Sequence, residues 1–73
     1  MSRYLITVDV STAHTINGRR GRCIHARTLF EQAGFVLYYR ESFTQFEAEG
    51  SERMLTVLLL QHNLSYVTVQ QLS

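Results

Sequence analysis

The 73-residue chain has a single cysteine, no proline, no tryptophan and no lysine, and none of its apolar runs is long. One cysteine excludes an internal disulfide, and no CxxC or HxxxH spacing offers a metal clamp. A chain of this size buries only about 60% of the surface that its unfolded form exposes. We therefore expect one domain over residues 1–73 and a partner subunit that supplies the missing stability.

The shortness of the apolar runs also bears on location. The longest, Met54–Leu60, is interrupted by Thr56 and is far shorter than the roughly 20 residues of a membrane span. The N-terminal residues lead directly into a strand-like segment with Asp9, an acid that the apolar region of a signal peptide would not contain. We expect a cytoplasmic protein without a membrane partner, in which Cys23 stays reduced.

The positive charge is carried by arginine alone and is unevenly distributed. Residues 1–37 hold five arginines against two acids, a net +3, whereas residues 38–73 hold two arginines against four acids, a net −2. A guanidinium grips phosphate or carboxylate with two parallel hydrogen bonds, so the first half favours anion recognition. Genomic base composition is the simpler explanation of the all-arginine set.

Hydrophobic periodicity predicts six elements. A central strand covers Tyr4–Val10, and after a polar connection over Ser11–Arg22 a helix carries Cys23 to Ala33. Two strands follow within Phe35–Glu49 and divide near Arg40–Ser42. A helix over Glu52–His62 and a last strand over Leu64–Gln70 complete the order. Gly34 suits a helix C-cap and Ser51 an N-cap.

This order predicts an α+β, ferredoxin-like β-α-β-β-α-β sheet with two helices on one face. The wide apolar stripe of the second helix and the open sheet face would leave apolar surface exposed, which a homodimer would cover. A competing arrangement uses Asn17-Gly18 as a type I′ hairpin turn that pairs residues near Thr15 with residues near Arg20, before a shortened helix.

Asp9 is the first candidate for chemistry, because it is an acid near the carboxyl end of an apolar strand. Ligands gather at that end of sheets with crossover helices. A carboxylate there is a ligand for a hard cation such as Mg²⁺, which activates water at a phosphate. The alternative is that Asp9 caps the following turn or pairs with an arginine.

A cluster of four arginines is the second candidate. Residues 19–27 contain Arg19, Arg20, Arg22 and Arg27 and no acid. At a helix start they would contact the phosphates of a nucleic acid or nucleotide. The alternative is a solvated basic segment balanced by Glu47 and Glu49 of a neighbouring subunit. A structureless connection of about twelve residues exceeds the usual length for a strand-to-helix link and favours function.

The other reactive residue types give weaker signals. His14, His25 and His62 fall on three separate elements without ligand spacing, and Cys23 lies on the apolar face of its helix as a core residue would. Four aromatic residues are candidates for stacking nucleic-acid bases, although packing against a dimer partner explains them as well. They are Tyr38, Tyr39, Phe43 and Phe46.

Four short segments follow one another along the chain: Tyr4-Leu5-Ile6-Thr7-Val8-Asp9-Val10-Ser11, Arg19-Arg20, Leu29-Phe30-Glu31-Gln32-Ala33-Gly34-Phe35 and Ser42-Phe43-Thr44-Gln45-Phe46-Glu47. In this order they resemble the Cas2 family of CRISPR adaptation proteins and its relatives, the VapD ribonucleases and the GhoS-type antitoxin. The resemblance implies a ferredoxin-like homodimer and, in some members, a metal-dependent nuclease. It implies that Asp9 binds Mg²⁺ and acts in catalysis, that Arg19 and Arg20 form the basic helix start, and that Phe46 and Glu47 end the second-strand motif.

Two functions follow as hypotheses. The first is a homodimeric Cas2-like protein that binds RNA or DNA through its arginines, with Asp9 as a candidate metal ligand of a nuclease. The second is a protein-binding regulator, an antitoxin or phage-type inhibitor, that engages its protein partner through a strand edge or an aromatic face. A small-molecule sensor with a ligand at the glycine-bearing loop around Asn17-Gly18 to Gly21 is a third.

Overall fold

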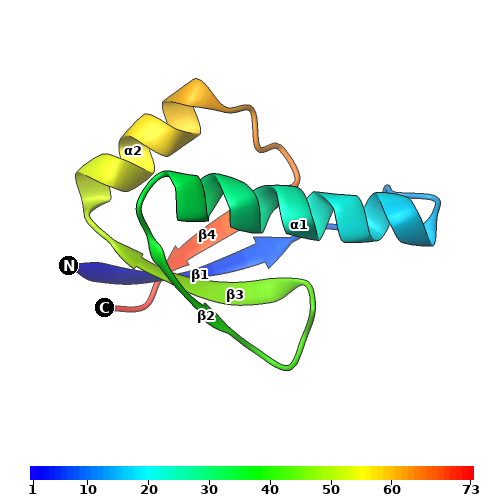
Figure 1. The fold of residues 1–73 in the computed structure, drawn as a ribbon, viewed down its shortest axis with the longest axis horizontal. Coiled ribbons are helices and arrows are strands. Elements are labelled where there is room, and N and C mark those ends of the chain that lie inside the picture. The colour runs from blue at the N-terminus through cyan, green and yellow to red at the C-terminus, as the bar shows by residue number, and fades with distance from the viewer.

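A computed structural model describes all 73 residues. The strands are β1 (Ser2–Val8), β2 (Val36–Tyr39), β3 (Gln45–Gly50) and β4 (Val67–Gln71), and the helices are α1 (Ile16–Gln32) and α2 (Glu52–Gln61). The strands form one antiparallel sheet in the order β2-β3-β1-β4, and both helices lie on the same side of it (Figure 1). The predicted α+β, ferredoxin-like arrangement is confirmed.

Alternation along the strands separates the two faces of the sheet. Tyr4, Ile6 and Val8 of β1 are buried, and in β3 the buried residues are Phe46, Ala48 and Gly50. Ile6 stands opposite Phe46 in the register, and Tyr4 stands opposite Ala48. Because side chains alternate with a period of two, this register gathers the apolar residues of both central strands under the helices.

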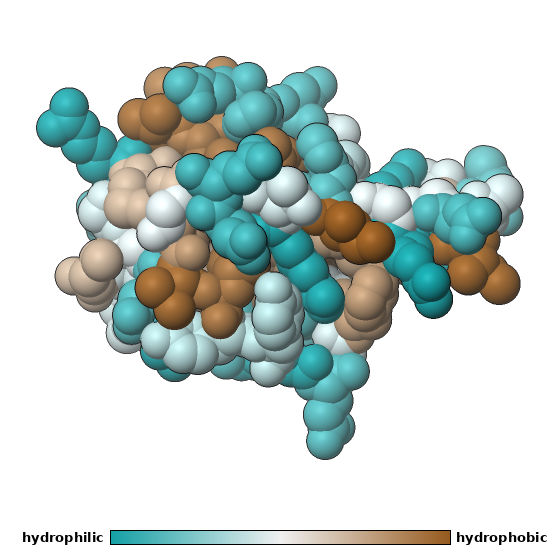
Figure 2. Space-filling view, viewed as in Figure 1, coloured by the Kyte–Doolittle hydropathy of each residue, from teal (hydrophilic) through white to brown (hydrophobic).

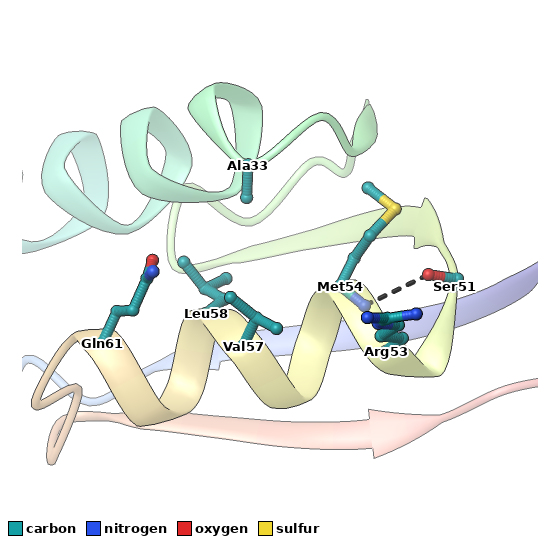
Figure 3. Close-up of a pocket in the computed structure, with 7 residues that line it drawn as sticks. All are labelled: Ala33, Ser51, Arg53, Met54, Val57, Leu58 and Gln61. Carbon is teal, nitrogen blue, oxygen red and sulfur yellow. Dashed lines mark hydrogen bonds between the residues drawn. The ribbon is translucent and has the colours of Figure 1, made fainter.

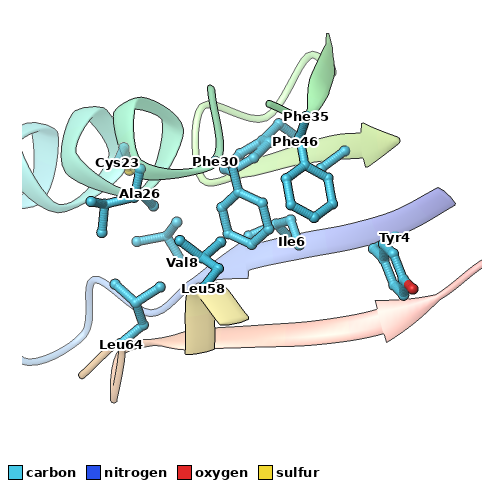
Figure 4. Packing of buried hydrophobic residues seen from close by; sticks show 12 residues of the cluster. Tyr4, Ile6, Val8, Cys23, Ala26, Phe30, Phe35, Phe46, Leu58 and Leu64 are labelled. Atoms are coloured by element: carbon cyan, nitrogen blue, oxygen red, sulfur yellow. The ribbon is translucent and has the colours of Figure 1, made fainter. Parts of the chain in front are cut away.

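The core is centred on aromatic contacts between α1 and the sheet (Figure 4). The Phe30 ring of α1 meets Phe35 and Phe46 edge to face, with centroid distances of 5.1 and 5.7 Å. Leu58 is the one fully buried residue of α2. Edge-to-face pairs add about 0.5–1.5 kcal/mol beyond the buried area, so α1 is the helix more firmly attached to the sheet.

Helix α1 begins earlier than the sequence pattern predicts. The structure corrects the predicted connection over Ser11–Arg22, because helix already forms at Ile16 and includes Asn17, Gly18 and Gly21. Neither a twelve-residue loop nor the type I′ hairpin turn at Asn17-Gly18 exists. The physical reason is the N-cap: the Thr15 hydroxyl accepts a hydrogen bond from the Gly18 N–H at 2.9 Å, which offsets the low helix propensity of two glycines.

The other helix boundaries agree with the predictions. Gly34 follows the end of α1 with a φ of +100°, in the left-handed region that glycine adopts without strain. The Ser51 hydroxyl accepts from the Met54 N–H at 3.1 Å and caps α2. The final strand starts at Val67 rather than Leu64, because Leu64 is buried in the core and its carbonyl closes a turn with the Val67 N–H.

The open face of the sheet is more polar than expected. Arg3 of β1 forms ion pairs there with Glu47 and Glu49 of β3, at 3.5 and 3.3 Å, and Arg40 pairs with Glu47 at 3.1 Å. The remaining side chains on this face are mostly threonine and glutamine, with Leu5, Val36 and Tyr38 among them. This face therefore offers little apolar surface that a partner subunit could bury. No helix combines the length and the apolar character that crossing a bilayer requires.

The close approach of β3 to Phe35 makes Gly50 a sensitive position. A Cβ at Gly50 would lie 2.6 Å from two atoms of the buried Phe35 ring. We expect Gly50→Ala to lower the free energy of unfolding by about 1–3 kcal/mol through overpacking. Gly21→Ala is the matched control, since a Cβ there meets nothing within 4 Å and an alanine inside a helix stabilises by about 1 kcal/mol. Urea denaturation that shifts both midpoints in the same direction would contradict this packing.

Candidate functional site

The outer half of α1 projects past the end of the sheet (Figure 1). All buried residues of the helix lie between Cys23 and Phe30, whereas Ile16–Gly21 are exposed throughout. No acid stands in the first turn, and the first acid in the helix is Glu31. The outer half, Ile16–Arg22, is therefore a largely exposed cationic projection, and it carries three of the four predicted arginines: Arg19, Arg20 and Arg22.

Two of these arginines hold the connection between β1 and α1. The Arg19 Nε donates a hydrogen bond to the Ala13 carbonyl at 3.2 Å. The Arg22 Nη1 donates to the Asp9 carbonyl at 3.0 Å and to the Thr12 hydroxyl at 2.6 Å. A guanidinium has five N–H donors, so both side chains are fixed in place and keep further donors for a ligand.

Arg27 holds a second connection, the one between β2 and β3, against the helix. Its Nη2 donates to the Phe43 carbonyl at 2.8 Å, in the connection between β2 and β3. The guanidinium carbon lies 4.7 Å from the centre of the Tyr39 ring and 4.5 Å from that of Phe43. We call Tyr39, Arg27 and Phe43 the arginine–aromatic stack. It ties the end of β2 and the following loop to α1.

Arg20 is the free member of the cluster. It is exposed and makes no hydrogen bond or ion pair within the chain. With Arg19, Ile16 and Phe43 it lines a hollow of about 240 Å³ between the outer half of α1 and the β2–β3 loop. Ile16, 75% exposed, also belongs to this site. The sequence did not indicate it as a site residue, because residue 16 falls in the predicted connection and not in the predicted helix. The signal available was Thr15, a residue that favours N-caps.

None of the four cluster arginines is paired with an acid. All three ion pairs of the chain involve Arg3 or Arg40 and lie on the opposite face of the sheet. Glu47 and Glu49, the residues considered as a balance for the cluster, are engaged there within their own chain. No ion pair therefore neutralises the arginines of α1, and the acids beside them are Asp9, which lies near Arg22, and Glu31, which follows Arg27 by one turn of the helix.

Asp9 is not a buried strand residue, in contrast to the prediction. The strand ends at Val8, and Asp9 is exposed in the turn that follows. Its Oδ1 accepts a hydrogen bond from the Ser11 N–H at 2.9 Å. Hydrogen bonding to the Ser11 side chain, followed by this bond to the Ser11 N–H, lowers the pKa of the carboxyl more than the charge of Arg22 does. Asp9 thus caps a turn, the alternative that the sequence left open.

Asp9 is the one carboxylate that the sequence predicts as a Mg²⁺ ligand. No three residues among the histidines, the cysteine and the acids of the chain lie together in a way that holds a metal ion. Mg²⁺ is commonly held by one or two carboxylates together with water and the phosphates of a substrate, so the predicted role of Asp9 as a Mg²⁺ ligand stays a prediction. We derive no metal-dependent step from this chain.

The histidines, the cysteine and the aromatic residues that the sequence offered as candidates differ in burial and in the face of the molecule on which they lie. His14 and His25 are exposed and apart, and Cys23 is 1% exposed within the core, where burial raises the pKa of its thiol. A thiol in that state is an unreactive core residue. Among the aromatic residues, Phe46 is completely buried and Tyr38 lies under Arg3 on the open face, so only Tyr39 and Phe43 remain beside the arginines.

A second surface of a different character lies on α2. Val57, Leu59 and Leu60 are 45%, 43% and 82% exposed. Beside them, Met54, Val57 and Leu58 face Ala33 at the end of α1 across a hollow of about 280 Å³ (Figure 3). Apolar residues gather over α2 and at the outer end of α1, and further apolar patches lie between these two places and at the lower left of the view, with polar residues around them (Figure 2). The predicted wide stripe of the second helix is present.

Comparisons with protein-family models, with curated proteins and with solved structures found no match to this chain. The resemblance to the Cas2 family therefore stays a prediction, and the geometry of the arginines and the aromatic residues is what indicates a function.

The turn at Asp9 gives a pH-dependent stability. The folded pKa is lowered from 3.8, so the ionised carboxylate stabilises the fold above that pH, and the contribution is lost as pH falls through the folded pKa. We expect Asp9→Asn to melt below wild type at about pH 7 and level with it at about pH 2. Glu41→Gln, which neutralises an exposed acid without a hydrogen bond, should match wild type at both. The measurement is the melting temperature by circular dichroism. If the difference between wild type and Asp9→Asn were the same at both pH values, the ionised carboxylate would not be what stabilises this turn.

Proposed function

We propose that this chain binds nucleic acid through the arginines of α1. The observation that carries the proposal is that four arginines lie along one helix and none of them forms an ion pair, while every ion pair of the chain is formed elsewhere. Proteins that contact phosphates do so with unpaired cations, because each contact releases a condensed counterion from the nucleic acid. The resemblance of four segments to the Cas2 family supports the same class of ligand.

The hydrogen bonds of the cluster support binding rather than only folding. Arg19, Arg22 and Arg27 each donate to a backbone carbonyl and so hold their guanidinium groups in fixed positions. A flexible arginine loses rotamer freedom when it grips a ligand, at a cost of about 0.5–1.5 kcal/mol per side chain. Here the side chains are already ordered in the folded chain, so binding loses little further rotamer freedom. The N–H groups that make no bond within the chain suit a ligand that accepts many hydrogen bonds.

The charge on α1 predicts how binding depends on salt. The slope of log Kd against log salt should approach 0.7–0.9 for each phosphate contacted, by the usual approximate relation. We expect Arg20→Ala to weaken binding of a labelled oligonucleotide and to lower this slope by about 1. Arg53→Ala is the matched control, because Arg53 is also an exposed helical arginine without a partner but lies on α2. Fluorescence anisotropy that shows equal losses in both variants would contradict the assignment.

A second function, protein binding, is favoured by the surface on α2. Leu60 is an apolar side chain in solvent, and it lies on the helix that lines the 280 Å³ hollow. A projecting leucine and an apolar hollow on one helix are complementary in a two-fold arrangement, in which each copy inserts its leucine into the other. We therefore propose that α2, rather than the open sheet face, forms the homodimer contact, because that face is polar.

This contact is testable by sedimentation. We expect wild type to sediment as a dimer and Leu60→Glu as a monomer, because a charge buried in an apolar contact is strongly unfavourable. Leu72→Glu places the same charge at an exposed leucine after β4 and should remain dimeric. The distribution should change little with salt, unlike nucleic-acid binding. A monomeric wild type, or equal effects of the two variants, would argue against the contact.

A further inference from the structure

Two exposed aromatic rings border the arginines of α1. Phe43 is 48% exposed and Tyr39 is 59% exposed, although both are large residues that a core would normally take up. They come from the end of β2 and the β2–β3 loop, and Arg27 lies against both. Aromatic rings beside uncompensated cations form a surface that accepts a flat, electron-rich group together with a negative charge.

The hollow at Phe43 gives this surface its shape. Its lining consists of one aromatic ring, one aliphatic side chain and two guanidinium groups: Phe43, Ile16, Arg19 and Arg20. Arg20 has no partner in the chain, and Arg19 uses only its Nε. A group that enters the hollow therefore meets an apolar ring, an aliphatic side chain and free N–H donors.

We infer that the nucleic acid is single-stranded and that a base stacks on the Phe43 ring in this hollow while Arg19 and Arg20 contact the adjoining phosphates. This inference rests on the proposed function. Bases in a duplex are stacked on one another and present only their edges in the grooves, whereas a single strand offers its ring faces. Stacking on an aromatic side chain is tolerant of sequence and serves RNA and DNA alike.

The arginine–aromatic stack prepares the ring for this role. The Phe43 carbonyl accepts the 2.8 Å bond from Arg27, so both the backbone and the ring of this loop residue are held against α1. Tyr39, at the end of β2, lies against the same Arg27 guanidinium and adds a second exposed ring to this surface. A ring held in place before the ligand arrives loses little freedom on binding.

The experiment measures binding of labelled oligo-uridylate and oligo-thymidylate of about 12 nucleotides, and of a duplex of about 12 base pairs. We expect both single strands to bind more tightly than the duplex. Phe43→Leu should weaken their binding about 5- to 150-fold, because a stacked base is lost. The salt slope should stay unchanged, because leucine alters no charge.

Tyr38→Leu is the matched control. It removes an exposed aromatic ring from the neighbouring position of β2, but on the opposite face of the sheet, and should bind as wild type does. Circular dichroism melting of each variant establishes that it is folded. Equal affinity of Phe43→Leu and wild type, or a duplex bound as tightly as the single strands, overturns the inference and leaves salt-dependent binding through Arg20 standing. Binding to none of the three probes overturns the proposed function itself.

Discussion

The contact of Phe30 with Phe35 and Phe46 is the constraint on which the rest of the structure depends. It attaches the second half of α1 to the sheet, and the register of β1 with β3 brings Ile6 opposite Phe46 beneath it. Because the helix is attached by this half alone, its first turns lie beyond the sheet. The position of the cationic surface is therefore a consequence of where the helix is buried.

Hydrogen bonds from arginine replace hydrophobic contacts in the outer part of the molecule. The β1–α1 and β2–β3 connections contain few buried residues, and each is fastened to α1 by a guanidinium that donates to a carbonyl. Lysine could not do this with the same geometry, since its ammonium is a point donor on a flexible stem. The all-arginine composition thus has a structural use, whatever its origin in the genome.

Much of the fold could be predicted from the sequence, and the errors have identifiable causes. Strand alternation, Gly34 and Ser51 are local signals that directly reflect backbone chemistry, so the element order and most boundaries were correct. The start of α1 was wrong because Asn17, Gly18 and Gly21 have low helix propensity, and the one local signal against it was the N-cap residue Thr15, whose hydroxyl accepts from the Gly18 N–H. Asp9 was misplaced for a related reason, since the apolar pattern continues to Val10 although pairing ends at Val8.

The division of α1 into two halves has a consequence for motion. The half from Cys23 to Phe30 is buried and can lose its hydrogen bonds only when the whole domain unfolds. The half from Ile16 to Arg22 has no core contact, and it can unwind by itself at the small cost of its N-cap and two arginine contacts. Any ligand that grips these arginines in their helical positions would suppress that unwinding, so occupancy of the surface and the local order of the helix are thermodynamically linked.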